Sequence, residues 1–339
     1  VTYMKKQFIK VLALSALASL ALSGCSEKAP TTPNEQDDSK KVYNVGVIQY
    51  ATHASLDNCY EGFVAGLAEK GIVEGDNLII DFQNSNSDTS NSDLQAKNMV
   101  SSKRDMLVGI ATPSAMSAYV ATKDAGIPMV FTAVSDPLVA GIVSSLTAPG
   151  GNCTGSSDVL NFDEQLKLIR AFLPEAKTIG VLYTTSEPNS ISHLARLETA
   201  AAKQGFTIEA VGVTSASEVA TATAAIVAKK VDCVTNFTDN NVVDNLSTVL
   251  HATDEAGIPV FGSEIEQVKN GCLASMSIDY IELGRVTGNI AAQILLGEAE
   301  AGSIPIATES SCFPVYNSAV AEKLGLKLPA EYSDIMDAA

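Results

Sequence analysis

The chain has 339 residues, of which 46% are hydrophobic and none is Trp, and its formal charge is −17 at pH 7. This length suits two domains of ordinary size. The acidic balance argues against nucleic acid or an anionic membrane surface as a partner, because both repel a negatively charged protein.

The first 24 residues have the pattern of a signal peptide. Three lysines near the start precede an apolar run over residues 11–22, which is too short for a typical transmembrane helix. The run ends in Leu-Ser-Gly-Cys at Cys25, and this tetrapeptide resembles the lipobox of bacterial lipoproteins. We therefore expect residues 1–24 to be a signal peptide and Cys25 to be lipidated, which would anchor the protein to the cell membrane on its extracytoplasmic face. The alternative is an ordinary cleavage site beside an incidental Cys.

Residues 25–41 have the composition of a flexible tether. They are polar, contain prolines and aspartates, and show no apolar periodicity. No second hydrophobic run of spanning length follows them, so we expect the remainder of the chain to be soluble.

From residue 43 onward, strand patterns alternate with helix patterns. Short apolar runs predict strands, and apolar residues at helical spacing behind a polar cap predict helices. Thr112 is expected to cap a helix with Pro113 at its first position. Alternating strands and helices predict parallel sheets with helices on both faces. The expected strands include 45–49, 78–82, 106–111, 129–133 and 273–278, and the expected helices include 55–69, 94–102 and 280–296.

Segments of the first half recur in the second half in the same order. Val45-Gly46-Val47-Ile48 matches Ile179-Gly180-Val181-Leu182, and Thr112 and Asp239 stand at matching positions after two corresponding strands. The spacing is far too long for a solenoid repeat, so the matches predict two doubly wound lobes that face each other. The alternative is that any two doubly wound domains share strand and turn composition.

The sequence lacks the motifs of common cofactor and metal sites. No GxGxxG follows the first strand, neither GxxxxGK nor CxxC occurs, and the three histidines are far apart. We therefore expect no cofactor and no metal. His53 follows the first strand and could face a cleft, but a histidine in a surface loop is the favoured interpretation. Five cysteines after Cys25 are expected to be mostly small buried hydrophobic residues: Cys59, Cys153, Cys233, Cys272 and Cys312.

One segment matches the pattern of a nucleophile elbow. Gly151-Asn152-Cys153-Thr154-Gly155 has Cys in place of the usual Ser, but an elbow needs a strand before it and a helix after it. The preceding Thr-Ala-Pro-Gly is typical of a turn. A crossover turn between lobes is therefore the favoured interpretation, and a thiol hydrolase that uses Cys153 remains the alternative.

Short polar side chains recur where predicted strands end. Helix N-termini there offer free N–H groups and a positive dipole end, which can hold a carboxylate without Arg or Lys. Asp239 would supply the anion for an ammonium group. Each Ser or Thr alone is explained as a helix cap, and only their coincidence with the acid favours a site. The residues of this set are Thr112, Ser135, Ser186, Asn189, Ser190 and Asp239.

Several motifs in a fixed order connect the chain with a known family. They include Gly109-Ile110-Ala111-Thr112-Pro113, Ser135-Asp136-Pro137, Thr238-Asp239-Asn240 and Asp279-Tyr280, and such motifs cover about residues 44–320. With them the chain resembles the ABC-transporter substrate-binding lipoproteins of the tryptophan/tyrosine-binding-like family. One departure is Phe237, which stands where family members carry a Pro.

The resemblance implies a type I periplasmic-binding-protein fold in which an amino-acid-sized ligand lies between two lobes. The two doubly wound parallel-sheet lobes would be joined by a hinge of three crossovers. Lobe 1 is expected at residues 42–153 plus 281–300, and lobe 2 at 154–280 plus 301–339. An ABC permease and its ATPase would be the partners of a monomeric binding protein. The resemblance also adds Asp136, Asn240 and Asp279 to the expected ligand-binding residues.

Aromatic residues near the predicted cleft favour an aromatic amino acid as the ligand. Tyr50 ends the first strand, Tyr183 ends its counterpart, and Phe237 precedes Asp239 by two positions. Each contact between a ligand ring and one of these rings would add about 0.5–1.5 kcal/mol to the binding energy that comes from burial alone. We therefore expect a solute-binding lipoprotein and not an enzyme. A binding protein that feeds a sensor instead of a permease is a second alternative.

Overall fold

The computed structural model describes residues 41–308, 312–333 and 335–339. The expected signal peptide, Cys25 and all of the tether except Lys41 lie outside these residues. Within the described part of the chain, no helix is both long enough and apolar enough to cross a membrane.

The first sheet has six parallel strands in the order β11-β5-β4-β3-β1-β2. Its central strands are continuous apolar runs, which suits a sheet that is covered on both faces. The strands are β1 (Tyr43–Gln49), β2 (Leu78–Asn84), β3 (Met106–Ile110), β4 (Met129–Thr132), β5 (Cys153–Ser157) and β11 (Ala307–Thr308).

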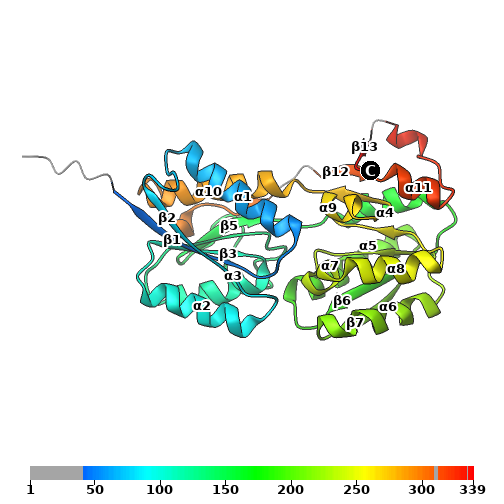
Figure 1. Cartoon of the computed structure of the whole chain (residues 1–339), viewed down its shortest axis with the longest axis horizontal. Helices are drawn as coiled ribbons and strands as arrows, with labels where there is room; N and C mark the ends of the chain where they lie inside the picture. The colour runs from blue at the N-terminus through cyan, green and yellow to red at the C-terminus, as the bar shows by residue number, and fades with distance from the viewer. Residues whose placement is uncertain (1–40, 309–311, 334) are drawn as a thin grey trace, which may run out of the picture. The chain divides into compact units, whose positions relative to one another are not determined.

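Helices cover both faces of this sheet. Helices α1 (Ala54–Glu69) and α10 (Tyr280–Leu295) lie on one face, and α2 (Thr89–Ser101) and α3 (Thr112–Thr122) lie on the other (Figure 1). Helices α1 and α10 touch through glycines, since a Cβ at Gly62 would overlap the carbonyl oxygen of Ile281 and a Cβ at Gly284 would overlap that of Cys59. The late helix α10 is thereby fixed to the first sheet.

The second sheet is parallel in the order β7-β6-β8-β9. Its strands are β6 (Thr178–Thr184), β7 (Thr207–Val213), β8 (Cys233–Thr235) and β9 (Val260–Phe261). A third group continues from it, because Leu273 N–H donates to Val260 O (2.7 Å) and Gly262 N–H donates to Ala274 O (3.0 Å). In this group β10 (Ala274–Ser277) pairs antiparallel with β12 (Phe313–Tyr316), which pairs in parallel with β13 (Met336–Asp337).

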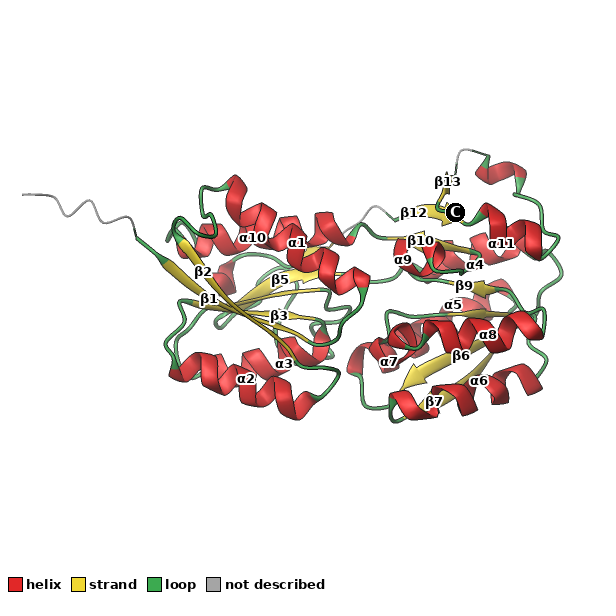
Figure 2. Cartoon of the chain, in the orientation of Figure 1, coloured by secondary structure: helices red, strands yellow, loops and turns green. Residues whose placement is uncertain are grey.

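Helices also cover both faces of the second sheet (Figure 2). Among them, α4 and α5 are strongly amphipathic in sequence, so each buries one face and exposes the other. The helices are α4 (Phe162–Phe172), α5 (Pro188–Gln204), α6 (Val219–Ala228), α7 (Asn240–Asp244), α8 (Leu246–Glu255), α9 (Ile265–Lys269) and α11 (Ser318–Lys323).

The chain passes between the two sheet systems three times: after β5, after β10 and after β11. This confirms the expected fold class of two parallel-sheet lobes joined by three crossovers. The first sheet also contains β5, most of which lies beyond the boundary expected at residue 153, and β11, which lies beyond the boundary expected at residue 300. We therefore propose a lobe boundary near Asp158.

Three local expectations need correction. The segment expected to be a crossover turn at residues 151–155 becomes strand β5 from Cys153 onward. Helix α2 begins five residues earlier than expected, since the Asp88 carboxylate accepts the N–H of Ser90 at 2.7 Å and caps it. The expected cap at Thr112 is absent, because Thr112 is already inside α3 and its preceding residue makes no side-chain cap bond.

Candidate functional site

A narrow cavity lies at the carboxyl ends of the strands, with about 330 Å³ of empty space between its lining atoms, open solvent included. Its lining residues follow β1, β3, β4, β5 and β10 on one side and β6, β8 and β9 on the other. Ligands of open α/β sheets bind at such strand ends. The lining residues are His53, Ser55, Leu56, Ala111, Thr112, Ala133, Ser135, Asp158, Asn189, Thr238, Asn240, Val243, Glu264, Gln267 and Tyr280.

Four of the expected ligand-binding residues line this cavity: Thr112, Ser135, Asn189 and Asn240. They come from both sides, with Thr112 and Ser135 after strands of the first sheet and the two asparagines at the starts of α5 and α7. Hydrogen bonds join the two sides around them. Ser192 Oγ donates to the Asp136 carboxylate at 2.7 Å, and Ser87 Oγ donates to the Asp244 carboxylate at 3.0 Å.

Asp239, expected to meet the ligand's ammonium group, does not line the cavity. It is fully buried as the N-cap of α7, and its carboxylate accepts hydrogen bonds from Thr184 Oγ1 (2.8 Å), Ser190 Oγ (2.6 Å) and Val242 N–H (3.0 Å), as well as from Thr184 N–H. Its oxygens are therefore occupied by its own half of the protein. The hydroxyl of Ser190, another expected ligand-binding residue, donates its hydrogen bond to this buried carboxylate and not to a ligand.

The three expected aromatic residues also lie away from the cavity lining. The Tyr50 hydroxyl donates to Ser87 O at 3.0 Å. Phe237 is fully buried, with ring centroids 5.7 Å from Phe162 and 5.3 Å from His193. Tyr183 is half-buried on β6. The apolar surface of the cavity comes instead from other side chains, among them Leu56, Val243 and Tyr280.

The remaining expected residues have structural partners or line another depression. The Asp136 carboxylate accepts Val139 N–H at 3.0 Å in addition to Ser192 Oγ. Asp279 caps α10 by accepting the N–H groups of Ile281 and Glu282, both at 3.0 Å. Ser186 lines a shallow groove beside Pro113 and Pro188.

Two lining residues hold strained backbone conformations. Ala111 has φ +76° and Ala133 has φ +55°, in the left-handed region that non-glycine residues rarely adopt. Such strain costs about 1–3 kcal/mol per residue and gathers at functional sites. Here it turns the chain sharply between β3 and α3 and between β4 and Ser135. Because Thr112 lies directly after Ala111, this turn places the start of α3 at the cavity.

Some buried polar atoms around the cavity have no hydrogen-bond partner within the described residues. They include Thr112 Oγ1, Asn189 Oδ1 and His53 Nδ1. Buried polar groups in folded proteins nearly always have a partner, so these atoms call for a ligand or water. Because Thr112 lies inside α3 and does not cap it, its hydroxyl is free to donate a hydrogen bond.

Glu187, which the sequence reasoning missed, lies behind the two asparagines. It is 1% exposed, and its Oε2 accepts Nδ2 of Asn240 at 2.8 Å, Nδ2 of Asn189 at 3.1 Å and N–H of Asn240 at 3.4 Å. Its Oε1 is buried without a partner. Burial, reinforced by the negative charge of Asp239, raises the pKa of Glu187 to about 8. The sequence signal that could have identified Glu187 was its position directly after Ser186, which was itself an expected ligand-binding residue.

Two further acids border the cavity and were also missed. The Asp158 carboxylate accepts Tyr280 Oη at 2.6 Å and Ser135 Oγ at 2.9 Å, and burial raises its pKa. Glu264 caps α9 by accepting the N–H groups of Glu266 (2.6 Å) and Gln267 (2.9 Å). Burial raises the pKa of Glu264 to about 7. Asp158 follows a strand that the sequence did not suggest, whereas Glu264 follows a short apolar run and could have been found as a cap.

His53 lines the cavity, so its interpretation as a surface-loop histidine is wrong. Its Nε2 lies 3.4 Å from Asn240 Oδ1 on the other side of the cavity. Burial lowers the pKa of His53, although the nearby Asp244 opposes this. The neutral imidazole therefore adds no positive charge to a cavity bordered by acids.

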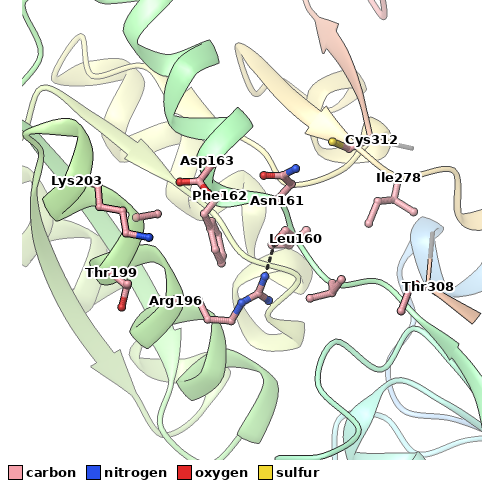
Figure 3. A pocket seen from close by; sticks show the side chains of 12 residues that line it. Leu160, Asn161, Phe162, Asp163, Arg196, Thr199, Lys203, Ile278, Thr308 and Cys312 are labelled. Atoms are coloured by element: carbon pink, nitrogen blue, oxygen red, sulfur yellow. Dashed lines mark hydrogen bonds between the residues drawn. The ribbon is translucent and has the colours of Figure 1, made fainter. Parts of the chain in front are cut away.

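A larger groove of about 1130 Å³, part of it open solvent, lies beside the crossovers (Figure 3). Figure 3 shows Arg196 and Lys203 from α5 on one side and Ile278 and Thr308 on the other. Arg196 donates to Leu160 O at 2.8 Å. The groove contains none of the expected ligand residues, so we assign no ligand to it.

Cys153 does not have the environment of a catalytic thiol. It is fully buried on β5, its Sγ lies 3.2 Å from Met129 Sδ, and burial raises its pKa. A reactive thiol needs a lowered pKa and access to solvent. Among the described residues, no group of three or more His, Cys, Asp or Glu side chains is arranged to hold a metal ion.

Comparison with known proteins identifies the family. Residues 44–336 match the family described as ABC transporter substrate binding protein. The chain is 40% identical over 306 residues to the tyrosine-binding protein of Clostridioides difficile strain R20291, covering 89% of this chain and 88% of that protein.

Two solved structures are similar to the described fold. One is the ABC domain from Streptococcus pneumoniae in complex with L-Trp (TM-score 0.84, 36% identity, covering 87% of this chain and 99% of that one). The other is the ligand-free, open structure of a substrate-binding protein with adhesive properties from Clostridium difficile (TM-score 0.67, 38% identity, covering 87% and 99%). At nearly equal identity, this chain is closer in conformation to the ligand-bound structure. The chain belongs to the family of ABC transporter substrate-binding proteins.

Proposed function

We propose that this protein captures an aromatic amino acid in the cavity between its two lobes and delivers it to the permease and ATPase of an ABC importer. The relatives support this choice, since one is named for tyrosine and another was solved with L-Trp. The cavity lies at the carboxyl ends of the strands, where open α/β sheets bind their ligands.

The observation that carries the proposal is the set of unpartnered polar atoms at the cavity. Asn189 Oδ1 is an acceptor that can receive an N–H of an ammonium group. The Thr112 hydroxyl is a donor at the first turn of α3, where free backbone N–H groups and the helix dipole favour a carboxylate. An α-amino acid carries an ammonium group and a carboxylate on the same carbon.

The side chain of the ligand would contact the apolar part of the lining. Leu56 and Val243 provide aliphatic surface from the two sides, and Tyr280 provides a ring whose hydroxyl is fixed by Asp158. Burial of an aromatic side chain against such surface contributes about 25 cal/mol per Å² of apolar area. The ring contacts expected from Tyr50, Tyr183 and Phe237 are replaced by these residues.

Membrane attachment through Cys25 completes the proposal. Diacyl modification supplies two chains, and stable anchoring requires two lipid signals. A monomer held on the extracytoplasmic face could meet its permease without leaving the membrane surface. A binding protein that feeds a sensor would share the same cavity and differ only in its partner.

A thermal-shift screen of the purified protein with all twenty amino acids tests the ligand. We expect the largest increase in Tm with tryptophan, tyrosine or phenylalanine, because a ligand that binds only the folded state stabilises it by mass action. Thr112→Val should weaken binding of that amino acid about tenfold, since it removes one hydrogen bond to a charged group and preserves side-chain shape. A shift from leucine, alanine or an acidic amino acid alone, with none from the aromatics, would refute the aromatic ligand.

A further inference from the structure

The carboxylate of Glu187 fixes the direction of two carboxamide groups. Glu187 Oε2 accepts hydrogen bonds from the Nδ2 groups of Asn189 and Asn240, so these amino groups face Glu187. Their Oδ1 atoms are then directed away from Glu187. Asn189 Oδ1 is buried and unpartnered, and Asn240 Oδ1 has only a long contact of 3.4 Å to His53 Nε2. Both asparagines line the cavity, so the site offers acceptors there.

The negative charge of Glu187 has no cationic partner in the described structure. Its oxygens meet only neutral N–H groups, and Oε1 meets none. Asp239 faces it from the start of α7 and is also acidic. Tyr50 lies near it after β1, and His53 and Asp244 lie around Asn240 on the far side. A buried charge without a counter-ion is strongly unfavourable.

We propose that Glu187 is the positioning residue that makes this site selective for an ammonium ligand. It holds the carboxamide oxygens of Asn189 and Asn240 toward the cavity, and its own charge is balanced only when the ligand's cation arrives. This inference rests on the proposed function, since it concerns the same cavity. Glu187 acts through the two asparagines, which are the side chains that line the cavity.

The arrangement couples ligand binding to release of a proton. Without ligand, burial and Asp239 raise the pKa of Glu187 to about 8, so at neutral pH a large share of the protein carries a proton there. An ammonium group bound at the two asparagine oxygens favours the ionised carboxylate behind them and lowers its pKa. Binding at pH 7 therefore expels the proton, and the affinity for an ammonium ligand rises as the pH increases from about 6 to 8.

The test compares ligands with and without the ammonium group, using L-tryptophan and indole-3-propionate as probes, with L-tyrosine and 3-(4-hydroxyphenyl)propionate as a second pair. Calorimetry is carried out on wild type, on Glu187→Gln and on Glu198→Gln, which neutralises an exposed acid on the same helix. Glu187→Gln should weaken amino-acid binding about tenfold or more and change binding of the deaminated analogue less than threefold. Glu198→Gln should change neither.

Proton release provides a measurement that needs no variant. Titration of wild type with the amino acid at pH 7, in buffers of different ionisation enthalpy, should show release of a fraction of a proton, and Glu187→Gln should abolish it. If neither amino acid binds wild type, the proposed function itself fails. If wild type binds but releases no proton, or if folded Glu187→Gln binds as wild type does, the role of Glu187 is refuted.

Discussion

Replacement of Asp239 by Ala should damage stability much more than ligand affinity. The carboxylate is fully buried and accepts hydrogen bonds from Thr184 Oγ1, Ser190 Oγ and the N–H groups of Thr184 and Val242. It also caps α7. Alanine would leave these donors without their acceptor, although it would remove no group that lines the cavity.

The magnitude follows from the number of donors. Loss of a helix cap costs about 0.5–2 kcal/mol, and each buried donor left unsatisfied costs about 1–3 kcal/mol. Water entering the space would satisfy some of the donors, so we expect a total loss of about 3–5 kcal/mol, the range found when a buried charged partner is removed. For a protein of this size the Tm would fall by roughly 6–20 °C.

Urea unfolding at pH 7 measures this loss, and calorimetry with L-tryptophan or L-tyrosine measures the affinity of the folded variant. Asp279→Ala is the matched control, because Asp279 caps α10 in the same way but is exposed, and it should cost only about 1 kcal/mol. The affinity of Asp239→Ala should stay within about threefold of wild type. A stability loss below about 1 kcal/mol together with a hundredfold loss of affinity would show that Asp239 binds the ligand directly.

Three further predictions concern packing, titration and anchoring. Gly284→Ala should lower the free energy of unfolding by about 1–3 kcal/mol, because its Cβ would overlap the backbone of Cys59 where α1 and α10 touch; an unchanged urea midpoint would contradict this. The folded-state pKa of Glu264 is raised to about 7 from an ordinary value of 4.5, so the stability that its protonated form provides is complete below pH 4.5 and lost as the pH rises through 7. Wild type should therefore lose stability between pH 5 and 8 relative to Glu264→Gln, and parallel urea midpoints for the two proteins would rule this out. Cys25→Ser should leave the protein in the soluble fraction or with its signal uncleaved, as judged by fractionation and mass spectrometry; processed protein that still sediments with membranes would argue against the lipid anchor.

The sequence alone determined the alternation of strands and helices and therefore the fold class. Apolar runs and polar caps are local signals, because a strand or a helix start depends on neighbouring residues. The cap at Asp279 and the helix after it appear as expected, with α10 spanning Tyr280–Leu295. The weakest local signal was that of β5, whose Cys-Thr-Gly-Ser-Ser sequence has no apolar run and becomes a strand only between β4 and β11.

Only the tertiary structure decided which polar groups meet the cavity. Sequence position shows that a side chain follows a strand, but the backbone of the loop decides where that side chain points. Asp239 and Glu187 both begin a helix after a strand of the second sheet, yet Asp239 is directed inward to Thr184 and Ser190, while Glu187 holds the two cavity-lining asparagines. Thr112 gained its free hydroxyl from the strained turn at Ala111, which no local pattern predicts. Convergence of eight strand ends on one cavity is a long-range property, and it sets the burial that shifts the pKa of Glu187 and leaves its charge for a ligand to balance.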